Sequence, residues 1–243
     1  SGPSSAVIVR HGNHLMFVAI HQPNYLPWIG YFRKIAQCDV FVFLDDVPFS
    51  KGSFTNRVKV LGSGVERWLS VPVSANLGDK INAIHPAKPN WLNSHMSSLT
   101  NYYVGAECFK TAWPKLRDIL AQVPNDRLDR INSCLVEAIS AELGLTCKFV
   151  RSSDHETGDS TGDRRLIDLL TQITPNATYL SGKGAKTYQD PEKYRASGFG
   201  FRYSDFDHPR YRQLSDAFVP GLSVVDLILN VGWKQAGQLI KQP

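Results

Sequence analysis

Cysteine is scarce in this sequence, and its spacing is not that of a metal site or a disulfide framework. The 243 residues contain four cysteines, Cys38, Cys108, Cys134 and Cys147, and no two of them form a CxxC pair. Zinc sites and small disulfide-linked proteins carry cysteines at short recurring intervals. The histidines form no HExxH pattern either. We therefore expect four free thiols, mostly buried, and no metal site built from cysteine or histidine.

Long hydrophobic runs are also absent. No apolar stretch approaches the roughly 20 residues that cross a bilayer as a helix, and the start of the sequence lacks the basic, apolar and small-residue regions of a signal peptide. These absences predict a cytoplasmic protein without a membrane span. Hydrophobic residues make up 42% of the chain, which is enough for a sizeable core.

Positive charge is in excess but is not concentrated anywhere. The net charge is +5 and the pI is about 9.0, yet lysine and arginine are spread along the chain and form neither a stripe nor a tail. This distribution does not favour nucleic acid as a partner. A pocket for a small anionic substrate accounts for the excess charge equally well.

The length predicts one large domain with an insertion. Residues 1–15 show no clear periodicity and are interpreted as an upstream or artificial extension, so His11 and His14 are set aside. Residues 16–243 are expected to form a single α/β domain. A mainly helical stretch at about 90–144 is expected to form a helical subdomain inserted between the halves of the sheet.

The most informative stretch is residues 20–57. Residues 16–20 are apolar and predict a buried strand, a loop with two prolines follows, and helical spacing begins at about Trp28. A second apolar run at 40–44 ends in Asp45 and Asp46. One short helix between two apolar strands predicts a parallel βαβ crossover. His21 and the aspartate pair should then lie on adjacent strand ends and face one crevice.

The remaining pattern predicts an α/β fold with a mainly parallel sheet, flanking helices and one β-hairpin. The hairpin is expected at 56–60 and 67–71, beside or over the crevice. Helices are expected at about 91–103, 111–122, 125–143, 163–173 and 222–231, with a short helix opening near 190. Further strands are expected at 146–150, 178–180 and 200–206.

His21, Asp45 and Asp46 are the candidate catalytic residues. A histidine at a strand end beside a rigid loop suits a general base, and a neighbouring carboxylate could orient it, take up a proton or hold a divalent cation. Each also has a purely structural interpretation: a lone histidine is usually structural, and paired aspartates after a strand commonly begin a turn. Only one of the two aspartates can face the crevice, because neighbouring residues of a strand point to opposite faces.

The candidate substrate-binding residues fall into three segments of the chain. Beside His21, the loop offers amides and aromatic rings that suit a polar substrate. Lys51, Asn56 and Arg57 would suit a phosphate or carboxylate, although an exposed basic hairpin explains them as well. Ser181 and Lys183 flank a glycine after a predicted strand and could cradle a phosphate. The loop residues in question are Gln22, Asn24, Tyr25 and Trp28.

Two common motifs of catalysis are missing. The segment at 181–185 lacks the upstream glycine and the Lys-Ser/Thr pair of a Walker A loop. No GxSxG motif occurs, and Cys38 stands near the end of an amphipathic helix, where a buried structural thiol is expected. The sequence therefore gives little support for nucleophilic catalysis.

Several of these segments also carry a family resemblance. The motif at 21–28, HQPNYLPW, is the most specific of them, and the others are GYF at 30–32, the strand at 39–46, Asn56-Arg57, YLSG at 179–182 with Tyr188, and FVPGLS at 218–223 with Asp226 and Asn230. From about Met16 to Gly232 the chain resembles the WbqC-like proteins of bacteria. Their genes belong chiefly to surface-polysaccharide and O-antigen clusters, so the resemblance implies a role in making or decorating an activated sugar and adds Tyr188 to the candidate substrate-binding residues.

The front of the chain also looks similar to nucleotidyltransferases of the pantothenate-synthetase kind. Those enzymes carry two histidines in an HxGH arrangement, whereas Asn24 stands at the second position here. Three functions remain open. The first is a transferase that adds an acyl or aminoacyl group, from a donor such as an acyl carrier, to an amino sugar nucleotide or a related amine. The second is nucleotidyl or phosphoryl transfer with Mg²⁺ on the aspartates, and the third is non-catalytic binding of a polysaccharide intermediate.

Overall fold

The fold was analysed in a computed structural model that describes residues 15–242. The extension expected at 1–15, with His11 and His14, lies outside the described residues except for Leu15. The strands are β1 (Phe17–His21), β2 (Val40–Phe43), β3 (Arg57–Gly62), β4 (Val65–Ser70), β5 (Val73–Ser74), β6 (His85–Pro86), β7 (Lys148–Arg151), β8 (Thr178–Ser181) and β9 (Gly200–Tyr203). The α-helices are α1 (Ile29–Ala36), α2 (Trp91–Tyr103), α3 (Phe109–Ala121), α4 (Leu128–Glu142), α5 (Gly162–Ile173), α6 (Pro191–Ala196), α7 (Val224–Val231) and α8 (Trp233–Lys241). Single 3₁₀ turns lie at Ile81–Ala83, Ser152–Asp154 and Lys183–Thr187.

The centre of the fold is a parallel sheet of five strands in the order β7-β2-β1-β8-β9. The α/β prediction is confirmed, including the first crossover: β1 continues through α1 into β2, and His21 is aligned with Phe43. Beyond Phe43, the Leu44 amide still donates a hydrogen bond to the His21 carbonyl, at 2.8 Å. The carboxyl ends of β1 and β2 therefore stand side by side.

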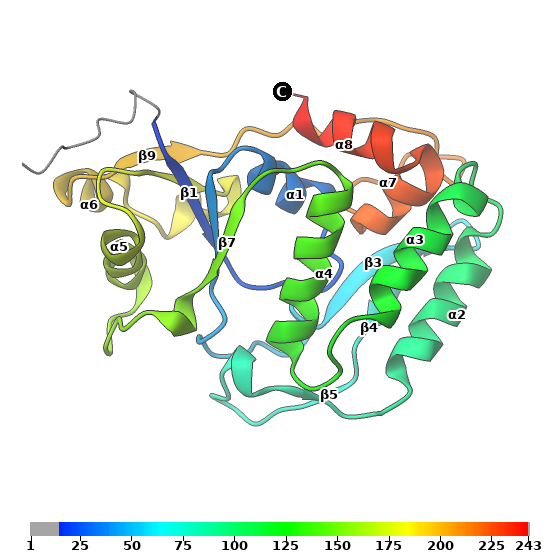
Figure 1. The fold of residues 1–243 in the computed structure, drawn as a ribbon, viewed down its shortest axis with the longest axis horizontal. Coiled ribbons are helices and arrows are strands. Elements are labelled where there is room, and N and C mark those ends of the chain that lie inside the picture. The colour runs from blue at the N-terminus through cyan, green and yellow to red at the C-terminus, as the bar shows by residue number, and fades with distance from the viewer. Residues whose placement is uncertain (1–14, 243) are drawn as a thin grey trace, which may run out of the picture.

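Helices cover both faces of this sheet, which explains why its central strands are apolar throughout. Alternate residues of β1 and β2 turn to opposite faces. One set, with Val18 and Val42, packs against α5 and α6, and the other set, with Ala19 and Phe41, packs into a larger core with α1, α4 and α7. Figure 1 shows α5 and α6 on one side of the sheet and the remaining helices on the other.

The helical segment of α2, α3 and α4 belongs to the larger core. Buried side chains such as Leu99, Leu116 and Leu135 lie in the same apolar cluster as Phe32 of α1 and Leu227 of α7. The hairpin of β3 and β4 is present, and β3 packs against α2 and α7. The segment thus extends the main core and has no separate core of its own among the described residues.

The strand order changes direction beside β1. The chain runs outward from β1 to β2 and β7, then crosses back to β8 on the other side of β1 and continues to β9. In open α/β sheets a ligand commonly binds at such a reversal, outside the carboxyl ends of the strands. A ligand site is therefore expected at the carboxyl ends of β1 and β8.

The structure describes the state of the cysteines and the character of the helices. All four cysteines are free thiols, but only Cys38 is buried and the other three are half-buried. Their exposure is higher than predicted, and Cys108 and Cys147 pack only as partly buried side chains against the larger core. Within residues 15–242, no helix is both long and apolar enough to span a bilayer.

Candidate functional site

A cavity of about 680 Å³ lies at the reversal point between β1 and β8. This volume is within the range of small-molecule sites. Its wall is built by four segments: the end of β1 (Ile20, His21, Gln22), one face of α1 with its preceding residue (Trp28, Gly30, Tyr31, Lys34), the segment after β8 (Ser181 to Ala185, Tyr188, Gln189) and the segment after β9 (Ser204, Phe206). Leu44, Leu166 and Tyr179 complete it.

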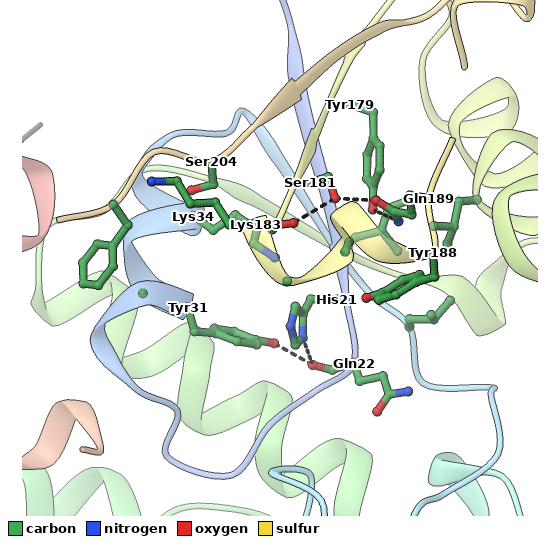
Figure 2. Close-up of a pocket in the computed structure, with 18 of the residues that line it drawn as sticks. His21, Gln22, Tyr31, Lys34, Tyr179, Ser181, Lys183, Tyr188, Gln189 and Ser204 are labelled. Atoms are coloured by element: carbon green, nitrogen blue, oxygen red, sulfur yellow. Dashed lines mark hydrogen bonds between the residues drawn. The ribbon is translucent and has the colours of Figure 1, made fainter. Parts of the chain in front are cut away.

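His21 is held in one orientation by its own loop. Its Nδ1 lies 3.0 Å from the Gln22 carbonyl, and the Tyr31 hydroxyl donates to the same oxygen at 2.9 Å; Figure 2 shows both bonds meeting there. A carbonyl only accepts, so Nδ1 carries the proton and Nε2 keeps its lone pair. The imidazole also stands edge-on to the Tyr31 ring, with 4.8 Å between centroids.

Burial keeps the His21 ring neutral. Loss of solvent, and next the charge of Lys34, lower the pKa of His21 to about 3, although the hydrogen bond to Gln22 opposes them. Within the described residues Nε2 has no hydrogen-bond partner. His21 therefore presents a proton-free nitrogen to the cavity at neutral pH.

Lys34 is a buried cation on the same wall. Only 7% of this residue is exposed, and burial lowers the pKa of its ammonium to about 8. Its Nζ lies 3.4 Å from the place that a Cβ atom on Gly182 would occupy, so the ammonium reaches the segment after β8. Figure 2 shows Lys34 beside that segment.

The segment after β8 is internally bonded. The Ser181 hydroxyl donates to Gln189 Oε1, and Gln189 Nε2 donates to the Tyr179 hydroxyl at 3.2 Å. Lys183 is more exposed and forms an ion pair with Asp205 at 2.9 Å, which raises the pKa of its ammonium. The two lysines thus approach the cavity differently, one paired with a carboxylate at the surface and one buried.

Aromatic rings surround the open part of the cavity. Trp28 is 39% exposed and Tyr188 is 74% exposed. The Trp28 ring packs edge-on against Phe206, with centroids 5.2 Å apart. Exposed rings beside a cavity offer flat surfaces on which a base or a sugar ring can stack.

The other residues of the HQPNYLPW loop hold its shape from outside the cavity. Asn24 is buried, and the Tyr25 hydroxyl pairs with His95 Nδ1 at 2.8 Å. Asn132 Nδ2 donates to the Pro23 carbonyl at 2.9 Å, and Ser223 Oγ donates to the Leu26 carbonyl at 2.7 Å. This loop is therefore tied to α4 and to the start of α7, and Asn24 and Tyr25 lie away from the cavity wall.

Asp45 and Asp46 lie beside the cavity but do not line it. Asp45 is fully buried and accepts hydrogen bonds from Ser152 Oγ at 3.0 Å and from the Ser153 amide and hydroxyl at 3.0 and 2.7 Å. Asp46 pairs with Arg165 at 2.5 Å and shares the single hydroxyl proton of Ser152 with Asp45. Although burial opposes it, these two partners lower the pKa of Asp46.

This geometry corrects the idea that an aspartate orients His21. The Gln22 carbonyl holds Nδ1 instead, because the chain turns directly after β1 and brings that carbonyl beside the ring.

The same geometry argues against binding of Mg²⁺ by the two aspartates. The carboxylate oxygens of Asp45 and Asp46 accept hydrogen bonds from the turn after β7, and Asp46 pairs with Arg165 of α5. The pair is therefore not arranged as a metal site. No cluster of three or more histidine, cysteine, aspartate or glutamate side chains within residues 15–242 could hold a metal ion.

Lys51, Asn56 and Arg57 also lie outside the wall of the cavity. Lys51 is exposed, and Asn56 is buried with its Nδ2 donating to the Val71 carbonyl at 3.2 Å. The Arg57 guanidinium stacks on the Trp68 ring, 4.0 Å from its centroid. Of the residues predicted from the sequence, the structure brings six together around the cavity: His21, Gln22, Trp28, Ser181, Lys183 and Tyr188.

The sequence interpretation missed Tyr31, Lys34, Gln189, Ser204 and Phe206, which also line the cavity. One signal was available. Trp28, Tyr31 and Lys34 are spaced by three, and residues three apart share one face of a helix. No comparable pattern marked the other three.

The comparisons with known proteins cover most of the chain. A model of the WbqC-like protein family matches residues 22–238. The uncharacterized protein Rv1507c of Mycobacterium tuberculosis (strain ATCC 25618 / H37Rv) is 32% identical to the chain over 218 residues, which cover 88% of the chain and 94% of that protein. No solved structure matches.

Proposed function

Because the chain belongs to the WbqC-like protein family, we propose that it is a cytoplasmic transferase of bacterial surface-polysaccharide synthesis. Its substrate is an amino sugar nucleotide or a related amine. An acyl or aminoacyl group is moved to the nitrogen of this substrate, from a thioester donor such as an acyl carrier. The cavity between β1 and β8 is where the acceptor binds.

The observation that carries the proposal is the state of His21. Its Nδ1 proton is committed to the Gln22 carbonyl, 3.0 Å away, and its unprotonated Nε2 borders a cavity large enough for a nucleotide sugar. A general base needs such a nitrogen within hydrogen-bond reach of the proton it takes. An acceptor amine at Nε2 satisfies this requirement.

The reaction then needs one proton relay. The amine nitrogen forms a C–N bond to the acyl carbon while its proton passes to His21 Nε2, and the C–S bond of the donor breaks when the proton returns to the leaving sulfur. Burial makes the free imidazole a weak base, with its pKa lowered to about 3. A bound anion beside the ring favours the imidazolium and raises this pKa toward the working pH.

Nucleotidyl transfer with Mg²⁺ is the less favoured function, since Asp45 and Asp46 are bound by serines and by Arg165 and do not border the cavity. A non-catalytic binding protein would use the same cavity without a need for Nε2. A transferase and a binding protein are distinguished by whether His21 variants lose catalysis or only binding.

The test is a transfer assay followed by mass spectrometry of the acceptor. Purified protein is incubated with amino sugar nucleotides and with acyl or aminoacyl thioesters, and His21→Gln is compared with wild type. We expect a product heavier by the acyl group with wild type, and at least a hundredfold slower formation with His21→Gln while acceptor binding persists. No product from any pair, or a product that His21→Gln forms at the wild-type rate, would overturn the proposal.

A further inference from the structure

The ammonium of Lys34 is buried without a carboxylate partner among the described residues. Lys34 is 7% exposed, and no described residue accepts a hydrogen bond from its Nζ or forms an ion pair with it. Burial lowers the pKa of Lys34, and the one group that opposes this is Cys38, whose own thiol pKa is raised well above its usual value by burial, so the thiol stays neutral. Buried charges in proteins are ordinarily paired. The missing partner of Lys34 is therefore to be sought in whatever fills the cavity.

We infer that Lys34 is the residue that binds the phosphate groups of the substrate, and that the cavity selects a nucleoside diphosphate or its sugar ester. The inference rests on the proposed function for the rest of the substrate. The position supports it: the Lys34 ammonium stands against Gly182 in the segment after β8, and both residues line the cavity. The Lys183 ammonium is paired with Asp205, so among the described residues Lys34 supplies the unpaired positive charge of this wall.

A phosphate group suits this position. Lysine binds phosphate as a compact point charge and needs no bidentate geometry, whereas arginine's fork serves phosphate and carboxylate alike. No arginine lines the described wall of the cavity. The hydroxyls of Ser181 and Ser204 border the same region but donate their protons to the side chains of Gln189 and Gln37, which leaves the Lys34 ammonium as the unpaired donor there.

The rest of the cavity fits a ring attached to the phosphate. Trp28 and Tyr188 are exposed beside it, and the volume of about 680 Å³ exceeds what a phosphate alone would fill. The phosphate would lie inside at Lys34, with the base or sugar against the rings nearer the solvent. His21, whose pKa the charge of Lys34 helps to lower, would then have an anion next to it.

The experiment is calorimetric titration of the full-length protein with pyrophosphate, UMP, UDP, a UDP-amino sugar and malonate. Wild type is compared with Lys34→Met, Lys34→Arg and, as a matched control, Lys110→Met, which removes an exposed lysine of α3. We expect at least tenfold weaker binding of UDP and pyrophosphate by Lys34→Met, partial recovery in Lys34→Arg, and wild-type affinity in Lys110→Met. Malonate should bind weakly to all four proteins.

Thermal melting without ligand gives an independent readout. Met removes an unpaired buried charge while keeping the length of the side chain, so Lys34→Met should melt at or above the wild-type temperature even though it binds less tightly. UDP binding by Lys34→Met equal to that of wild type would overturn the inference, as would malonate binding as tight as that of UDP. If UDP affinity depends on Lys34 but no acyl transfer occurs, the proposed function fails and this inference stands. If Lys34→Met binds UDP as tightly as wild type and still catalyses acyl transfer, this inference fails and the proposed function stands.

Discussion

The imidazole of His21 and the hydroxyl of Tyr31 donate hydrogen bonds to one acceptor, the carbonyl oxygen of Gln22, over 3.0 and 2.9 Å. The two groups come from consecutive elements, the end of β1 and the first turns of α1. The shared acceptor fixes both the tautomer and the direction of the His21 ring, as a carboxylate does in many catalytic sites.

Replacing Tyr31 by Phe should therefore weaken this arrangement without breaking the fold. The variant loses one hydrogen bond, worth about 1 kcal/mol of unfolding free energy, and keeps the ring against His21. We expect a loss of that size in urea unfolding and transfer several-fold slower than in wild type. Tyr102→Phe is the control, because its hydroxyl makes no hydrogen bond within residues 15–242. A Tyr31→Phe protein with the stability and rate of Tyr102→Phe would show that the shared acceptor does not matter.

The stability of the protein should fall as the pH is lowered from 6.5 to about 4. Burial lowers the pKa of His21 to about 3 and that of His95 to about 4, so the unfolded chain binds more protons than the folded protein throughout this range. Each histidine contributes up to about 1.4 kcal/mol per pH unit. His95→Gln should reduce the slope of the unfolding free energy against pH. A flat profile for wild type would contradict the burial of both rings.

Gly30→Ala should displace the Trp28 indole. A Cβ atom at residue 30 would lie 2.4 Å from two carbons of that ring, closer than real contacts allow. Alanine also favours the helix by about 1 kcal/mol relative to glycine, so the fold should persist. We expect altered tryptophan fluorescence and weaker UDP binding, with Gly105→Ala as a control because a Cβ there meets open space. Unchanged binding in Gly30→Ala would remove Trp28 from the site.

Asp45 is expected to stabilise the carboxyl end of β2 and not to set the tautomer of His21. Asp45→Asn weakens the hydrogen bonds from Ser152 and Ser153, which should cost about 1–3 kcal/mol of unfolding free energy. The nitrogen NMR shifts of the His21 ring should still report the tautomer with the proton on Nδ1. Asp159→Asn, at an exposed position, should alter neither. A changed His21 tautomer in Asp45→Asn would restore the orienting role that the sequence suggested for an aspartate.

The sequence was most informative where periodicity and breakers coincide. The apolar runs on either side of α1 and the prolines at 23 and 27 predicted the βαβ unit, and with it the place of His21 at a strand end. The return of short strands after residue 146 predicted the other half of the sheet. What periodicity cannot give is the strand order, and it is this order that places β8 next to β1 and the segment from Ser181 beside His21.

Residue types alone did not indicate which candidate residues line the cavity. Arg57 has the chemistry of an anion site, but its guanidinium stacks on Trp68, across the hairpin from its own strand. Lys34 looked like one lysine among many, because its buried ammonium lies against Gly182, which is 148 positions further along the chain. Such long-range contacts decide which charges are paired, and a single sequence does not display them.

The most direct test of the account is a crystal structure of the protein with a bound UDP-amino sugar. We predict that the diphosphate lies within hydrogen-bond distance of Lys34 Nζ, beside Gly182, and that the amine of the sugar points to His21 Nε2. A ligand bound instead at Arg57 and Trp68 on the hairpin, with the cavity between β1 and β8 empty, would contradict both the site and the role given to His21.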